Sequence, residues 1–212
     1  MNLSEMRTRV RRDLHDEDAG SYRWTDSELD RHIERAVREL SLATPHEAKA
    51  TLTTAAESRD LSLSTLTDLV AVEAVEYPVD KYPPSYVPFS LWAGTLTLLV
   101  DEVPLSAQTV NVYYGQMHTL DADTSTIPPQ LEEVVADGGA AYAAIEWASF
   151  ATNRINAGGD DVWQQYLTWG QERLAAFASA LAQHGRRNAV RVRSLYTPAR
   201  PTADENTPFE GG

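Results

Sequence analysis

At 212 residues the chain is long enough for one domain with an appendage, and it carries a formal net charge of −13 and no cysteine. These properties exclude thiol catalysis, thiolate zinc sites and disulfides, and they argue against a surface that coats nucleic acid. Because it has neither an apolar membrane span nor a signal-peptide core, we expect a soluble protein made in the cytosol.

The first 49 residues predict two amphipathic helices. The first covers residues 3–15, with apolar side chains on one face at Leu3, Met6, Val10 and Leu14. The second begins at a helix-start motif made of Trp24, Thr25, Glu28 and Leu29. Thr25 is a good N-cap that Glu28 completes as a capping box, and Trp24 and Leu29 have the spacing of a hydrophobic staple. This helix should end near Thr44.

From residue 50 to residue 120 the apolar pattern changes to that of strands. Short segments rich in β-branched and aromatic residues are separated by turn residues, and Gly94 is expected in a hairpin turn. Val110, Val112 and Tyr114 alternate with more polar neighbours, so one face of that strand should be buried. The segment therefore predicts a small antiparallel β domain inserted between helical parts.

Residues 121–185 predict a C-terminal helical hairpin that completes the bundle. A linker rich in Asp and Thr leads to helices over about 129–155 and 160–185, and the small-residue run GGAAYAA allows close helix approach. Residues 186–212 then predict an extended tail, basic at first and acidic afterwards. The fold class is thus α+β: a helical bundle with an inserted antiparallel β domain and a C-terminal tail.

The sequence contains no recognisable catalytic, cofactor-binding or metal-binding set. The five histidines lack the spacing of metal ligands, and the glycine pairs lack the lysine of a phosphate loop. Asp121 and Asp123 superficially resemble a phosphotransferase loop, although a solvated linker explains them more simply. Glu146 lies in an apolar run, where it either faces solvent or pairs with an arginine across a subunit interface.

The basic part of the tail has three interpretations: a nucleic-acid arm, a docking segment for another protein, or an ordinary charged terminus. Its arginines alternate with aliphatic residues, which suits an extended segment lying on a partner. The candidate docking residues are Arg186, Arg187, Val190, Arg191, Val192, Arg193, Leu195 and Tyr196.

The order of these parts, with the run RWTDSELDRHIERAVREL at residues 23–40, resembles the head–tail connector (adaptor) proteins of tailed bacteriophages and related archaeal viruses. The resemblance implies a ring, usually of twelve copies, in the neck of a virion between the portal protein and further neck or tail-completion proteins. It also implies that the basic tail docks on the portal and that genomic DNA passes without specific binding. The inserted β domain departs from the most compact members of that family.

Our leading hypothesis is a non-enzymatic structural adaptor that lines the DNA exit channel and uses no cofactor. The alternative is a cytosolic helical regulator that binds nucleic acid through the arginine-rich C-terminal segment. A steep loss of DNA affinity with salt would favour the alternative.

Overall fold

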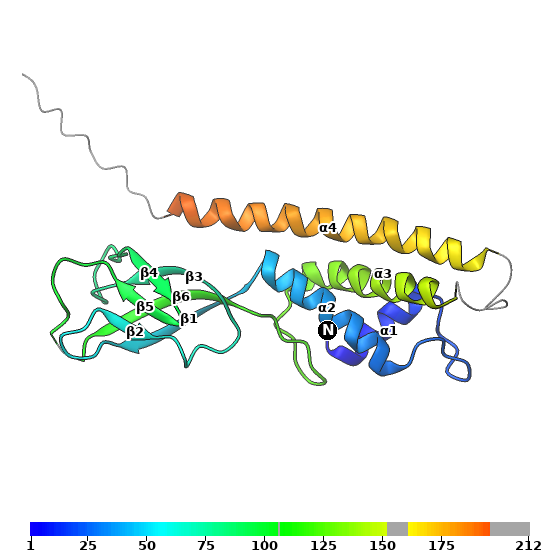
Figure 1. Ribbon diagram of the computed structural model, residues 1–212, viewed down its shortest axis with the longest axis horizontal. Helices are drawn as coiled ribbons and strands as arrows, with labels where there is room; N and C mark the ends of the chain where they lie inside the picture. Colours follow the sequence, from blue (N-terminus) through cyan, green and yellow to red (C-terminus); the bar gives the residue numbers. More distant parts are fainter. Residues whose placement is uncertain (106, 152–160, 196–212) are drawn as a thin grey trace, which may run out of the picture.

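The computed structural model describes residues 1–105, 107–151 and 161–195, which form a helical lobe and a β lobe (Figure 1). The helical lobe contains α1 (Leu3–Asp13), α2 (Asp26–Ala43), the short 3₁₀ helix η1 (Pro129–Leu131), α3 (Glu132–Ala151) and α4 (Val162–Leu195). The β lobe is inserted between α2 and η1. This arrangement confirms the predicted α+β class with its inserted β domain. None of the helices in the described ranges is long and apolar enough to cross a membrane.

Helix α3 lies at the centre of the helical lobe, between α4 on one side and α1 and α2 on the other (Figure 1). Its small residues allow this, since five alanines have no exposed surface: Ala136, Ala140, Ala141, Ala143 and Ala144. A Cβ atom added at Gly138 would lie 2.9 Å from both Ala36 Cβ and a ring carbon of Phe177. The close helix approach predicted from the run GGAAYAA is therefore confirmed.

The core of the helical lobe is built from the apolar faces that the sequence predicts. Met6 and Val10 of α1 are buried, as is Leu14 directly after its last residue, and the buried face of α2 consists of Leu29, Ile33, Val37 and Leu40. Among the side chains that the structure describes, the largest fully buried one is Phe177, which comes from α4. One helix boundary here differs from expectation, since α1 ends at Asp13 rather than at residue 15; α3 is described as far as Ala151, and the expected end near residue 155 lies outside the described residues.

The β lobe is a sandwich of two three-stranded antiparallel sheets. Its strands are β1 (His46–Thr53), β2 (Asp60–Ser62), β3 (Leu69–Glu76), β4 (Phe89–Trp92), β5 (Thr95–Leu98) and β6 (Thr109–Gln116). The sheet orders are β1-β6-β3 and β2-β5-β4. The two sheets enclose a separate core, which consists of Leu61, Leu63, Val75, Leu96, Leu98, Val110 and Val112.

Local turn and strand predictions in this lobe are largely correct. Gly94 follows Ala93 in the β4–β5 hairpin, and the two residues have positive φ angles of 75° and 47°, as a tight hairpin turn requires. Val110 and Val112 are fully buried, but Asn111 between them is also buried, because it bonds with Thr51 and Glu76 on the neighbouring strands. The lobe begins at His46, four residues earlier than expected, because β1 pairs with the whole length of β6.

The prediction of an extended tail from residue 186 is wrong for its first part. Helix α4 continues to Leu195, so the backbone of residues 186–195 is helical. The Arg–Val alternation is short, whereas arginine, alanine and leucine are good helix formers and no proline occurs between Val162 and Pro198. Intrinsic helix propensity therefore outweighs a strand-like alternation of only a few residues. The side chains of residues 186–195 and all of residues 196–212 lie outside the described residues.

His118 joins the two lobes where the chain passes between them. Its Nε2 atom lies 3.0 Å from the Thr44 carbonyl oxygen, and its Nδ1 atom lies 3.0 Å from the Thr126 carbonyl oxygen and 3.1 Å from Thr126 Oγ1. Its backbone N–H donates to Ser41 Oγ at 2.9 Å. The residue is 7% exposed, and through these bonds it ties the end of α2 to the segment that comes after β6.

Acid should weaken this junction. Burial lowers the pKa of His118, against the opposing effect of its bonds to Thr44 and Thr126, and the neighbouring His46 lowers it further. The folded chain thus binds this proton less readily than the unfolded chain, whose histidine pKa is about 6.5. We expect the free energy of unfolding to be retained above that pH and to fall as the pH drops below it.

Urea unfolding at several pH values between about 7 and 5.5 measures this dependence. His118→Gln should reduce the slope but not abolish it, because burial also lowers the pKa of His32. Asp30 and Glu34 line a cavity beside His118 and stay unchanged in the variant. An unchanged slope in His118→Gln would contradict the assignment.

A second prediction concerns the central helix. Gly138→Val should lower the free energy of unfolding by about 2 kcal/mol or more, because the added carbons overlap Ala36 and Phe177. Ala175→Val, on an exposed position of α4, is the control and should cost only about 0.5 kcal/mol in helix propensity. Equal losses in the two variants, measured by thermal or urea unfolding, would show that Gly138 does not set the helix distance.

Candidate functional site

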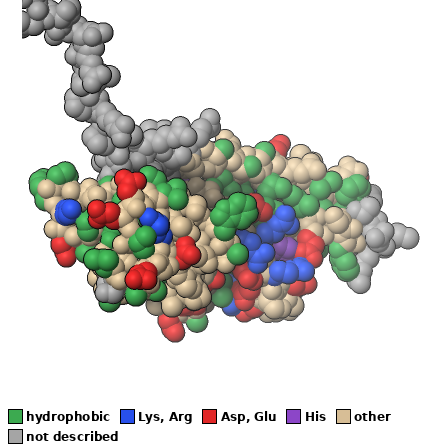
Figure 2. All heavy atoms as spheres, turned by 60° about the vertical axis from the view of Figure 1, so that its left-hand side comes forward, with side chains coloured by type: hydrophobic (Ala, Val, Ile, Leu, Met, Phe, Trp, Pro, Cys, Tyr) green, Lys and Arg blue, Asp and Glu red, His purple; other side chains and the backbone are tan. Residues whose placement is uncertain are grey.

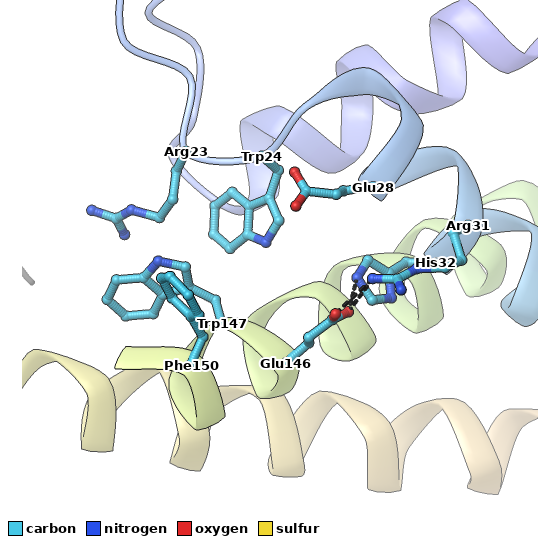
Figure 3. Close-up of a pocket in the computed structure, with 8 residues that line it drawn as sticks. All are labelled: Arg23, Trp24, Glu28, Arg31, His32, Glu146, Trp147 and Phe150. Carbon is cyan, nitrogen blue, oxygen red and sulfur yellow. Dashed lines mark hydrogen bonds and ion pairs between the residues drawn. The ribbon is translucent and has the colours of Figure 1, made fainter. Parts of the chain in front are cut away.

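Two of the predicted residue sets come together in one pocket of about 250 Å³ (Figure 3). Trp24 and Glu28 come from the helix-start motif, and Glu146 comes from α3. The pocket also contains residues that the sequence did not single out, namely Arg23, Arg31, His32, Trp147 and Phe150. It lies at the start of α2 and the end of α3, beside the first turns of α4 (Figure 3).

The helix-start motif forms the capping box that its spacing predicts. The Thr25 N–H donates to Glu28 Oε2 at 2.7 Å, and the Glu28 N–H donates to Thr25 Oγ1 at 3.3 Å. The backbone and hydroxyl bonds from Thr25 lower the pKa of Glu28. Trp24 and Leu29 are both buried in the core of the helical lobe, 4% and 0% exposed. The motif thus fixes the first residue of α2 and carries Trp24 into the core.

Aromatic rings and an arginine form one half of the pocket. The Trp147 ring centroid lies 4.8 Å from that of Tyr166 on α4 and 6.4 Å from that of Trp24. The Arg23 guanidinium lies 4.4 Å from the Trp147 centroid and 5.1 Å from that of Tyr166. These are cation–π distances, so Arg23 is held by ring faces. The cluster connects the start of α2 with α3 and α4.

Ion pairs form the other half of the pocket. Arg31 NH2 lies 2.6 Å from each carboxylate oxygen of Glu146, and His32 Nε2 lies 2.7 Å from Glu146 Oε2. Burial lowers the pKa of His32, while the Glu146 charge opposes that change. Glu146 is half exposed and has partners within its own chain. Pairing of Glu146 with an arginine of a neighbouring subunit stays a prediction. The carboxylate does not need that pairing to have a charged partner, because Arg31 already supplies one.

A buried ion pair supports the loop in front of α2. Arg11 NH1 lies 2.6 Å from Asp16 Oδ2, and the two side chains are only 7% and 6% exposed. Arg11 NH2 also donates to the Trp24 carbonyl oxygen at 3.0 Å and to Asp26 Oδ1 at 2.8 Å. Asp16 Oδ1 accepts a bond from the Arg23 N–H at 2.7 Å. These bonds place Arg23 and Trp24 at the pocket.

Only a weak sequence signal indicates this pair. Arg11 and Arg12 are neighbours, and so are Asp16 and Glu17, with the same spacing of five residues. Arg12 and Glu17 form only a solvent-exposed pair at 3.5 Å. The distinguishing signal is the helical period, because Val10 and Leu14 place Arg11 next to the buried face of α1.

The remaining candidate residues lie away from the pocket. Asp121 accepts backbone bonds from Asp123 at 2.9 Å and from Thr124 at 2.7 Å, which is a local turn. In the ranges that the structure describes, no group of three or more His, Cys, Asp or Glu residues is placed to hold a metal ion. The docking side chains predicted at 186–196 lie outside the described residues.

Figure 2 shows basic and acidic side chains side by side on the surface. On α2, Arg35 pairs with Glu39 at 3.4 Å and Arg38 pairs with Glu34 at 3.7 Å, one helical turn apart. Such exposed pairs add little stability and leave the helix face close to neutral.

Comparison with known proteins gives one family match. A family model described as the SU10 adaptor protein matches residues 1–201. Comparison with curated proteins gives no match.

Two solved structures are partly similar. A chain from the neck of an empty GTA particle, computed with C6 symmetry, is 16% identical, with 80% of this chain and 88% of that chain covered and a TM-score of 0.28. A chain from the neck of a native GTA particle, computed with C12 symmetry, is 14% identical, with 79% and 89% covered and a TM-score of 0.29. At these TM-scores the structural likeness alone establishes nothing further.

The buried pair allows a matched test. Asp16→Ala should lower the free energy of unfolding by about 3 kcal/mol, because it leaves the Arg11 charge buried without its closest partner. Glu17→Ala removes the adjacent exposed pair with Arg12 and should change stability by less than about 0.5 kcal/mol. Urea unfolding measures both, and equal effects would refute the central role of the buried pair.

Proposed function

Because this chain belongs to the SU10 adaptor protein family, we propose that it is the adaptor ring that joins the portal to downstream neck or tail components. The family match confirms the adaptor resemblance of its sequence and supports the predicted location in the neck of a virion. The observation that carries the proposal is the length of that match, which covers residues 1–201 of the 212-residue chain.

The rigid helical lobe suits a ring. A closed ring requires every copy to repeat the same interface angle, so elements at the interface must be held at fixed directions. Both N-terminal helices begin with complete capping boxes, at Asn2 and at Thr25. The Arg11–Asp16 pair and the Trp24–Trp147–Tyr166 cluster then fix α2 against the rest of the lobe. We therefore place the subunit contacts of the ring on this lobe.

Helix α4 provides a means of reaching the portal. At Gly185 it still lies against the last turn of α2, since an added Cβ would be 3.1 Å from the Ala43 carbonyl oxygen. Its backbone then continues for ten more residues to Leu195. The residues proposed for portal docking, Arg186 to Leu195, belong to this last stretch of α4, and Tyr196 comes directly after it. Five arginines without an acidic residue in 186–200 suit an acidic surface on the partner.

The charge of the chain suits a channel for DNA. At −13 the protein repels phosphates overall, and a lumen that must let DNA slide should form few phosphate contacts. We place acidic surface toward the lumen, and we expect genomic DNA to pass without specific binding.

The mass of the purified full-length protein, alone and mixed with the portal from the same genome, tests this proposal. A ring of about twelve copies, formed alone or only on the portal, is the expected result. Native mass spectrometry or mass photometry distinguishes a ring from smaller species. A monomer or dimer that ignores the portal would refute the adaptor function.

A further inference from the structure

Arg23 stands out among the charged residues of the pocket. Among the described residues it pairs with no carboxylate through its side chain, and its contacts are the ring faces of Trp24, Trp147 and Tyr166. Figure 3 shows its guanidinium on the far side of Trp24 from Glu28. Glu28 is occupied by Thr25, and Glu146 by Arg31 and His32. The half of the pocket around Glu146 is therefore neutralised. The other half presents the Arg23 cation on the rings of Trp24, Trp147 and Tyr166, which together we call the Arg23 platform.

Such a platform favours a particular ligand chemistry. In the described part of the chain no carboxylate takes up the guanidinium N–H groups, which can donate to a carboxylate of a ligand, and the rings around them offer an apolar surface. Phe150, which is 53% exposed, extends this surface at the mouth of the pocket. A peptide segment with an aromatic side chain next to an acidic one fulfils both conditions.

The chain itself contains such a segment. Residues 201–212, PTADENTPFEGG, carry three acidic residues and no basic one, and Phe209 directly precedes Glu210. We infer that this segment of one copy binds the Arg23 pocket of a neighbouring copy, with Phe209 on the rings and Glu210 on the guanidinium. The inference deepens the proposed ring, on whose self-association it rests.

Distance decides between the chain's own pocket and that of a neighbour. Tyr166 packs on Trp147 of the pocket. Leu195 lies about 44 Å from Tyr166 along α4, at a rise of about 1.5 Å per residue. A flexible segment the length of 195–209 has a root-mean-square span of about 20 Å. Reaching its own pocket would stretch the segment to more than twice that span. A second copy arranged head to tail brings its pocket closer, as heterologous ring contacts do.

The test uses a labelled peptide and the full-length protein. The receptor is the full chain carrying Phe209→Ala and Glu210→Gln, so that its own tail cannot occupy the pocket. A fluorescein-labelled peptide of residues 201–212 is titrated into it at low salt, and fluorescence anisotropy is measured. Saturable binding is expected, and Arg23→Gln in the receptor should weaken it about tenfold or more.

Two controls keep the result interpretable. Arg12→Gln removes an exposed arginine that is paired with Glu17, and it should leave the affinity unchanged. A peptide with Phe209→Ala should also bind about tenfold more weakly or worse, which requires no change in the receptor's fold.

Absence of saturable binding, or equal binding to the Arg23→Gln receptor, would overturn the inference. If the protein forms rings while the peptide does not bind, only this inference fails and the proposed ring stands. If neither occurs, the proposed function fails as well.

Discussion

The helical lobe depends on one buried ion pair, Arg11 with Asp16. Removing two charges from water is costly, and the pair is compensated only because its remaining hydrogen-bonding groups also find partners. Those partners are the Trp24 carbonyl, Asp26 and the Arg23 N–H, all at the start of α2. Satisfying the buried charges therefore fixes the path of the loop between α1 and α2. A loop conformation that left these bonds unmade would leave two buried charges without their hydrogen bonds.

The fixed loop has consequences at a distance. It delivers Trp24 to the end of the lobe, where the ring meets Trp147 from α3 and Tyr166 from α4. The same loop positions the capping box, and α2 then presents Ala36 to Gly138 at a distance that leaves no room for a side chain. The four helices are thus positioned by contacts in the middle of α3, at Gly138, and near its end, at Trp147. A subunit held this way presents the same surface in every copy.

The sequence predicts most of what is local and little of what is distant. The capping box and the Gly94 turn depend on residues one to three positions apart, and the buried faces depend on helical and strand periodicity. The partner of Glu146 cannot be chosen from sequence, because Arg31, Arg35 and Arg38 have the same local character and only the fold brings Arg31 across. The end of α4 is equally ambiguous, because a short Arg–Val alternation fits a strand as well as a helix. Arg11 and Arg12 differ only in the direction each faces on α1.

Charges that are paired inside the lobe differ from groups that can contact a partner. Interactions within the lobe neutralise buried charges such as those of Arg11 and Asp16, so these charges are not available to a partner. For partners we propose the Arg23 platform, which packs on Tyr166 near the start of α4, and the basic residues Arg186 to Arg193, which lie about 30–40 Å further along that helix. A single long helix separates them and keeps that separation constant. In a ring, a constant separation between two contact points converts the shape of one subunit into the geometry of the whole assembly.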